Sequence, residues 1–366
     1  MNKSLVSYLS EVEDFRNTSS KNFRHPLLDI LLLSVCAVFS GAEDFEDITL
    51  FGRDKEEFLS SFISFPHGIP SHDTIRRVFI HLDSQSFNHQ FMSWVEDSLS
   101  GLGLSFSQIS IDGKTLRGSK SGIHLVSAVA SELGLSLGQV KTSEKSNEIT
   151  AIPALLELLV LEGCIVSIDA MGTQHSIIEK ILSKGGDYFL ALKKNQKELH
   201  REVQEQFERK AEACEVYQRS AWTASHNQVV DYKVSVCQDF TWVDSREKWQ
   251  ELKSLVKVET QSKNRGKEER FYITSLAGLR ANKAFEIARG HWASENKLHW
   301  QLDVSFKEDQ QRHRTGNAPE NLALLRKIVL NIAQMKETKL SKKKILKKMA
   351  WNDEYFMKMM KDILNI

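Results

Sequence analysis

The chain has 366 residues, of which 41% are hydrophobic and 27% charged, so its composition excludes a disordered or membrane-embedded class. Its formal net charge is only +1, from 49 basic and 48 acidic residues, so any affinity for an anionic polymer must come from local basic patches. The four cysteines form no CxxC pair, which predicts reduced thiols in a cytoplasmic protein without a zinc ribbon. The apolar run at residues 30–42 is too short to cross a bilayer, so we expect a buried helix and no membrane partner.

The first hundred residues have the pattern of a helical domain. Apolar periodicity predicts a core helix over residues 25–42 and an amphipathic helix over residues 51–62. A third, short helix is expected to begin after Ser71, an N-cap candidate, and to carry Arg76 and Arg77. Such an ending is typical of a helix-turn-helix unit whose arginines contact DNA. The alternative is a plain helical bundle with both arginines on a solvated surface.

After residue 101 the pattern indicates a mixed α/β domain, which we expect to continue to residue 335. Strand and helix patterns follow one another at 107–114, 123–132, 133–142, 148–161 (helix), 164–171, 173–185 (helix) and 187–194. Residues 197–280 interrupt this order with a charged helix and alternating segments, which predict an inserted antiparallel sheet. The helical period returns from Ala281 to about Leu302. A basic tail at 336–366, with nine lysines and four acids, is either a solvated amphipathic helix or a DNA contact.

Two acids at strand ends are candidates for chemistry. Asp112 and Asp169 each close a Ser-Ile-Asp triplet at the end of an apolar strand. A carboxylate there is costly to bury unless a cation compensates it, and carboxylate oxygens are good ligands for Mg²⁺. Two ions about 4 Å apart can activate an attacking oxygen and stabilise a leaving oxygen during phosphoryl displacement. The alternative is that each aspartate only caps the turn that follows its strand.

The third acid of such a site is expected in the stretch HWASENKLHW. On a helix His291, Glu295 and His299 fall on one face, so Glu295 could complete the aspartate pair while the histidines meet substrate phosphates, with Asp303 as the reserve candidate. A second interpretation is a zinc site made by His291, Glu295 and His299, although the HExxH order is missing. A third is a core helix with an incidental glutamate. The sequence predicts that Glu308, which follows, lies in a loop.

Basic residues follow each of these acidic elements and could contact phosphates of a polyanion. The candidates after the acids and the last sheet strand are Lys114, Arg117, Lys193, Lys194, Lys197, Arg312, Arg314, Arg326 and Lys327. Each cluster could also be ordinary solvated surface. Their repeated position after the candidate acids favours phosphate contact.

Several long motifs, in order, make the chain recognisable. IDGKTLRGS, IVSIDAMGTQ, GGDYFLALKKNQ and HWASENKLHWQLDVSFKEDQ together resemble the transposases of a bacterial insertion-sequence group that includes the H-repeat-associated proteins, and RHPLLDILLLSVCAVFSGA resembles that group's N-terminal domain. The likeness covers roughly residues 10 to 335. It implies a ribonuclease H-like catalytic fold with an inserted β segment, a helical N-terminal DNA-binding domain at residues 1–100, and cleavage and joining of transposon-end DNA.

The resemblance also implies a catalytic triad of two aspartates and a glutamate that binds two Mg²⁺ or Mn²⁺ ions. Carried onto this sequence, the triad is Asp112, Asp169 and Glu295. Wider relatives place a tyrosine, an arginine and a lysine where this chain has Ala288, His291 and Leu302, and Arg289 or His291 could substitute for the arginine.

The implied partners are double-stranded DNA of the element's terminal repeats and of the target, and a second copy of the chain in the DNA complex. The implied location is the cytoplasm, with the protein on the nucleoid when bound to DNA. The alternative function is a catalytically decayed relative that still binds DNA.

Overall fold

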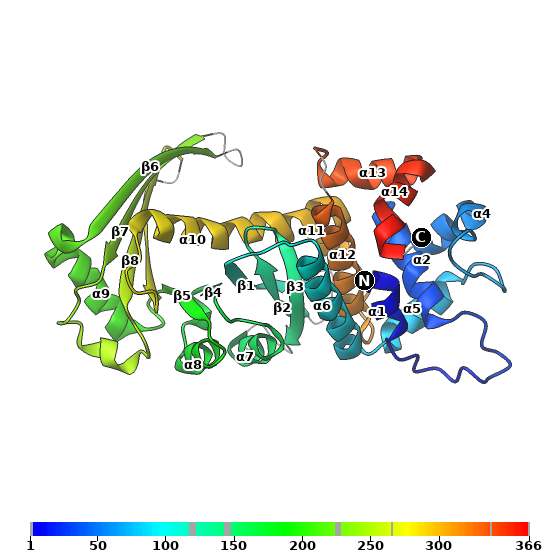
Figure 1. Ribbon diagram of the computed structural model, residues 1–366, viewed down its shortest axis with the longest axis horizontal. Helices are drawn as coiled ribbons and strands as arrows, with labels where there is room; N and C mark the ends of the chain where they lie inside the picture. Colours follow the sequence, from blue (N-terminus) through cyan, green and yellow to red (C-terminus); the bar gives the residue numbers. More distant parts are fainter. Residues whose placement is uncertain are drawn as a thin grey trace.

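A computed structural model describes residues 3–116, 122–142, 148–223, 228–264, 266–336 and 339–364, and gives only the backbone at residues 223, 228, 293–296 and 362. Figure 1 shows a long twisted sheet with helices on both faces and a helical domain at one end. The mixed α/β class predicted from the sequence is therefore confirmed.

The first five strands form the part of the sheet that carries the candidate acids. An antiparallel meander comes first, and two strands parallel to β1 follow it. The strands are β1 (Gln108–Thr115), β2 (His124–Ala130), β3 (Leu135–Thr142), β4 (Ile165–Ile168) and β5 (Asp187–Leu192). The crossover helices α7 (Glu148–Leu158) and α8 (His175–Ser183) cover one face, because the parallel strands need long connections. The spatial order is β3-β2-β1-β4-β5.

The segment predicted as an inserted sheet extends this same sheet. Strand β9 pairs antiparallel with β5, and three more strands follow outward, so that nine strands form one sheet in the order β3-β2-β1-β4-β5-β9-β8-β7-β6. The added strands are β6 (Glu215–Thr223), β7 (Gln228–Cys237), β8 (Ser254–Ser262) and β9 (Gly266–Thr274). The charged helix α9 (Lys197–Arg209) packs its apolar side against the part of this extension that is nearest to β5. It lies on the same face of the sheet as α8.

A long helical segment crosses the opposite face of the sheet (Figure 1). The sequence predicts one helix from residue 281 to about 302, but the structure divides it into α10 (Ala281–Ser294), a π-helical turn η5 (Glu295–His299) and α11 (Trp300–Phe306). Helix α10 is anchored on the extension by apolar contacts, since the ring of Phe285 lies 5.6 Å from Tyr217 and 5.2 Å from Tyr232. The side chain of Trp300, at the start of α11, is exposed.

The helical domain combines both ends of the chain. Its members are α1 (Leu5–Ser10), α2 (Leu27–Phe39), α3 (Phe45–Asp54), α4 (Glu56–Leu59), α5 (His72–His81), α6 (Ser84–Gly101), α12 (Ala318–Met335), α13 (Lys342–Trp351) and α14 (Asp353–Leu364). Short 3-10 turns complete the fold: η2 (Ala170–Gly172), η3 (Ala211–Ala213), η4 (Asp244–Lys248) and η6 (Glu308–Gln310). Helix α12 lies between the sheet and the other helices.

The predictions for this domain can be compared with the structure. Helix α2 is buried along nearly its whole length, as expected, and within the described ranges no helix meets the length and apolarity needed to cross a membrane. Ser71 caps α5 by accepting a hydrogen bond from the backbone N–H of Thr74. The amphipathic helix expected at 51–62 is two helices that meet at Lys55. The basic tail belongs to this domain, because the ring of Phe356 in α14 packs against the rings of Phe58 and Phe62.

Candidate active site at the ends of β1 and β4

The structure places Asp112 and Asp169 side by side. Strands β1 and β4 run parallel with Ile111 paired to Ile168, so the next residue of each strand is one of the two aspartates. Adjacent strands lie about 4.8 Å apart. Two residues earlier, the hydroxyls of Ser110 and Ser167 are 3.0 Å apart, and side chains two positions apart point to the same face. Both carboxylates therefore lie on the face that α10 crosses.

Each carboxylate is held by a neighbouring backbone amide. The N–H of Gly113 donates to Oδ1 of Asp112 (2.9 Å), and the N–H of Met171 donates to Oδ1 of Asp169 (3.1 Å). Asp169 thus caps η2, as one interpretation of the sequence suggested. The side chain of Asp112 is about one third exposed (33%), so solvent reaches it.

The helical segment above the aspartates is fixed at three points. Gln108 donates from Nε2 to the carbonyl of Ile287 (2.9 Å), Ser167 Oγ lies 3.1 Å from Nδ1 of His291, and Nε2 of His299 lies 3.5 Å from Oδ2 of Asp112. A side chain at Gly290 would clash with Gln108, so this glycine lets α10 approach β1 closely. The later residues of the segment therefore lie over the later residues of β1.

Both histidines of the HWASENKLHW stretch face the sheet. Burial lowers the pKa of His291 to about 4, although the nearby charge of Asp169 opposes the shift. Burial, together with the charges of Lys327 and Lys114, lowers the pKa of His299 to about 3. Both imidazoles are therefore neutral at physiological pH. The backbone of Glu295 lies between them, at the start of η5, while its side chain lies outside the described part of the structure.

The donor chemistry of the two aspartates fits a hard divalent cation. Carboxylate oxygens at neighbouring positions are the ligands that Mg²⁺ and Mn²⁺ prefer. Among the side chains that the structure describes, no group of three His, Cys, Asp or Glu is placed to bind a metal. His291 and His299 have separate partners in Ser167 and Asp112, which disfavours the zinc interpretation.

Lys114 lies two residues after Asp112 and has a different environment from the one predicted. Its ammonium pairs with Asp303, with Oε2 of Glu308 (2.8 Å) and with Asp309 (3.7 Å), and its side chain is largely buried. Burial alone would lower the pKa of Lys114, but Glu308 and Asp303 outweigh burial and raise it. The phosphate contact predicted for Lys114 is therefore disfavoured, because three carboxylates already surround it.

Glu308 is the residue that sequence reasoning missed. The sequence predicts a loop residue at this position, but the structure buries Glu308 in η6. Burial disfavours its ionised form, yet the charges of Lys114 and Arg326 prevail and hold the pKa of Glu308 below its usual range. Arg326 and Lys327, which the sequence suggests as phosphate contacts, are buried beside it instead, so that prediction is wrong. Asp303, the reserve for the third acid, belongs to this same charged cluster rather than to the aspartate pair.

The remaining basic candidates separate into exposed and occupied residues. Lys193 and Lys194 are exposed directly after β5, which runs parallel to β4, so they lie at the edge of the sheet where the aspartates lie. Arg289 is occupied, because it donates to the hydroxyl of Tyr232 (2.8 Å) and stacks on that ring. Arg117 lies outside the described residues.

The other arginines lie on the surface of the helical domain and of the loop before α12. Arg76 is exposed and pairs with Asp73 at 2.9 Å, and Arg77 is exposed beside it. Arg312 and Arg314 are exposed on the loop between η6 and α12. The bundle interpretation and the DNA-binding interpretation of α5 both accommodate this exposure.

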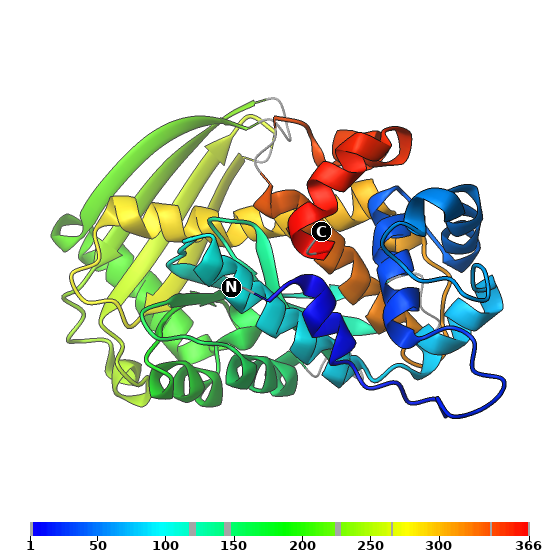
Figure 2. The same cartoon turned by 45° about the vertical axis from the view of Figure 1, so that its right-hand side comes forward.

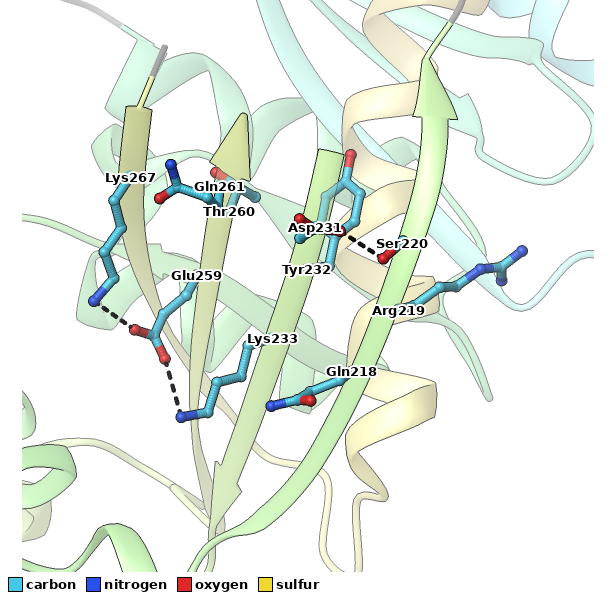
Figure 3. A pocket seen from close by; sticks show the side chains of 10 residues that line it. All are labelled: Gln218, Arg219, Ser220, Asp231, Tyr232, Lys233, Glu259, Thr260, Gln261 and Lys267. Atoms are coloured by element: carbon cyan, nitrogen blue, oxygen red, sulfur yellow. Dashed lines mark hydrogen bonds and ion pairs between the residues drawn. The ribbon is translucent and has the colours of Figure 1, made fainter. Parts of the chain in front are cut away.

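A separate hollow of about 340 Å³ lies on the extension (Figure 3). Lys233 and Glu259, which line it, follow residues that pack against α10, so they point to the face opposite the aspartates. Glu259 pairs with Lys267 (2.9 Å) and with Lys233 (3.9 Å). The lining of this hollow carries three basic and two acidic side chains, and the hollow is independent of the aspartate pair.

The sequence matches two family models. The model described as "Transposase DDE domain" matches residues 79–332, and the one described as "DDE_Tnp_1-associated" matches residues 6–95. The aspartate pair and η5 both lie within the first range. Residues 336–366 lie outside both.

Relatives of known sequence cover almost the whole chain. It is 39% identical over 345 residues to the "H repeat-associated putative transposase YhhI" of Escherichia coli (strain K12), which covers 90% of each chain. It is 38% identical over 373 residues to the "Putative transposase YncI" of Escherichia coli O157:H7, covering 96% of this chain and 93% of that one. Among solved structures, a piggyBac transposase synaptic complex with hairpin DNA aligns with 12% identity and a TM-score of 0.47, over 99% of this chain and 78% of that one.

Proposed function

Because the chain belongs to the DDE-domain transposases, we propose that it cuts the ends of an insertion sequence and joins them to target DNA. The observation that carries the proposal is that Asp112 and Asp169 directly follow Ile111 and Ile168, which are paired across two adjacent parallel strands. A single acidic residue beside a strand is common, but two acidic residues at matching positions of adjacent strands create a shared site for divalent cations.

The strand order supports a ribonuclease H-like catalytic domain. A meander of three antiparallel strands is followed by two parallel strands that add beside β1, with helices α7 and α8 in the crossovers. In this proposal strands β6 to β9 are the family's inserted β segment, and the helical domain supplies DNA contacts.

Asp112, Asp169 and Glu295 are proposed to hold two Mg²⁺ or Mn²⁺ ions. When bound, such ions supply charge stabilisation for the attacking and leaving oxygens of a phosphodiester. Backbone amides orient one oxygen of Asp112 and one of Asp169, which fixes the direction of both carboxylates. The neutral imidazoles of His291 and His299 fill the space beside the carboxylates without adding charge.

The reaction we propose needs no covalent protein intermediate. Water breaks the phosphodiester at the end of the element and releases a 3′-hydroxyl. That hydroxyl then attacks a phosphodiester of the target, so a new phosphorus–oxygen bond forms as the old one breaks. Lys193, Lys194, Arg312 and Arg314 are exposed and are proposed to contact the phosphates of double-stranded DNA. Pairing of two ends favours a homodimer in the DNA complex.

The alternative is a decayed relative that binds DNA without cutting it. Two of the positions where wider relatives place polar residues are apolar and buried here, since Ala288 and Leu302 are each 1% exposed. A phosphate contact is impossible at these positions. Both aspartates are nevertheless present and adjacent, which favours the active enzyme.

Cleavage of labelled duplex carrying the element's ends tests the proposal. We expect cutting with Mg²⁺ or Mn²⁺, no cutting with EDTA, and a loss of at least about 100-fold in Asp112→Asn, Asp169→Asn and Glu295→Gln. Asp187→Asn is the matched control, because Asp187 lies at the opposite end of β5, where it accepts a hydrogen bond from Ser275. Cutting retained by Asp112→Asn would refute the mechanism, and DNA binding without cutting by the unaltered protein would establish the alternative.

A further inference from the structure

Helix α13 has a face made of lysines. Lys343, Lys344, Lys347 and Lys348 are all exposed, while Ile345, Leu346 and Met349 are buried on the other side. The spacing i, i+1, i+4 and i+5 places the four ammonium groups in two adjacent rows along one face of the helix. We call this face the lysine stripe.

Within the described part of the chain, no carboxylate lies within ion-pair distance of the four lysines of the stripe, so none compensates their positive charge there. Other exposed lysines, such as Lys248 and Lys283, pair with glutamates. The nearest acid in the sequence, Asp353, pairs with Lys55 at 2.7 Å. Four like charges on one short helix raise its local potential well above that of a nearly neutral protein.

The helix is rigidly placed. Lys342, at its start, donates from Nζ to the carbonyl of Ala333 near the end of α12 (2.7 Å). Ile345 and Met349 are buried in the main hydrophobic core, and Lys348 lies 4.2 Å from the ring of Tyr355 in α14. The stripe is therefore a preorganised surface, which reduces the entropy lost when a ligand binds.

Its position relates it to the aspartate site. Helix α13 contacts α11, the helix that follows the π-helical turn containing Glu295. Figures 1 and 2 both show α13 on the same side of the sheet as α10 and α11, while α7 and α8 lie on the other side. A long polyanion bound across α10 and α11 would reach the stripe.

We propose that the lysine stripe binds the phosphate backbone of double-stranded DNA beyond the cleaved end. This inference rests on the proposed function, since that function supplies duplex DNA on this side of the molecule. From Lys343 to Lys348 the helix rises about 7.5 Å, and a duplex carries one negative charge per about 1.7 Å of its axis, so about four phosphates match the stripe. An anionic membrane is a poorer partner, because the apolar face of α13 is already buried against protein and cannot enter a bilayer.

The test replaces all four lysines of the stripe by glutamine. Binding of the full chain to a fluorescein-labelled duplex several helical turns long is measured by anisotropy at increasing NaCl concentration. Each lost phosphate contact lowers the slope of log Kd against log salt by about 0.9, so we expect a decrease of about 2 to 4. A variant with four arginines instead should keep the slope, because phosphate contact requires charge.

A charge-matched control separates a local contact from the change in net charge. Replacing Lys180, Lys210, Lys248 and Lys283 by glutamine removes the same charge from lysines that are at least partly exposed and pair with carboxylates elsewhere, and the slope should not change. If the unaltered protein binds and cuts DNA but the stripe variant keeps its slope, the stripe proposal is refuted while the proposed function stands. The stripe proposal is also refuted if the glutamine variant loses binding to anionic vesicles while its DNA binding is unchanged. A protein that neither binds nor cuts DNA refutes both proposals.

Discussion

Replacing Glu308 by glutamine is the sharpest test of how the region beside the aspartates is stabilised. Glu308 is 2% exposed, and its Oε2 lies 2.8 Å from Nζ of Lys114. The buried side chains of Arg326 and Lys327 are the other cations near it. Glutamine keeps the shape of the side chain but removes the charge, so three cations lose their most buried anion.

The magnitude follows from the geometry. At 2.8 Å and an effective dielectric constant of about 20, one ion pair is worth about 6 kcal/mol before desolvation. Asp303 and Asp309 still compensate Lys114, which reduces the loss. Removing one partner of a buried pair typically costs about 3–5 kcal/mol, and we expect the free energy of unfolding of Glu308→Gln to fall by that amount.

Urea unfolding at neutral pH measures this difference. The control is Glu198→Gln, because Glu198 and Lys248 form a pair at 2.9 Å whose side chains are 59% and 63% exposed, and solvent screens such pairs so that they contribute little to stability. The pKa of Glu308 is held below its usual value, so its contribution is present above the unfolded pKa, near 4.3, and disappears as the pH falls through the folded pKa. A loss at pH 7 no larger than that of the control would refute the reasoning.

Three further changes test other parts of the structure. Burial lowers the pKa of Lys327 to about 8, so above that pH the unfolded chain binds more protons than the folded chain. Between pH 8 and 10 the free energy of unfolding of the natural protein should therefore rise, relative to that of Lys327→Met, by up to about 1.4 kcal/mol per pH unit. Urea titrations at several pH values measure this difference. A Cβ at Gly113 would clash with Glu148 and His124, so Gly113→Ala should cost about 1–3 kcal/mol in the same assay, and an unchanged midpoint would contradict the close packing. Ser71→Ala removes the N-cap of α5 and should cost about 1 kcal/mol, while Ser61→Ala, at a position whose hydroxyl only donates to Phe58, should cost less.

The strands and most helices could be predicted from the sequence because their signals are local. The run ISID marks β1 by its β-branched residues, and the apolar stretch at 25–42 matches α2. Asp112 and Asp169 were identified because a carboxylate ending an apolar strand is itself unusual. Their pairing was a hypothesis that needed the parallel register of β1 and β4.

Other features depend on contacts between distant residues. The π-helical turn at Glu295 was not predicted from the sequence. One residue inserted into a helix and a change in the side of the helix that is apolar produce the same periodicity. Glu308 looks like a loop acid until Lys114, 194 residues earlier, is known to contact it. Cys214 directly precedes β6 and Cys237 ends β7, so the pairing of these strands brings the two thiols together, and the hydrogen bond with the Cys214 thiol lowers the pKa of Cys237.

The inserted strands explain why the third acid of the proposed triad comes so late in the sequence. Helix α10 lies on the extension through Phe285, whose ring contacts Tyr217 and Tyr232, before it reaches Gln108 at the start of β1. Its direction across the sheet is therefore set by strands β6 to β9, and that direction determines where η5 passes Asp112. The segment that interrupts the sheet in sequence thus becomes, in the folded chain, the support that positions the helix bearing Glu295.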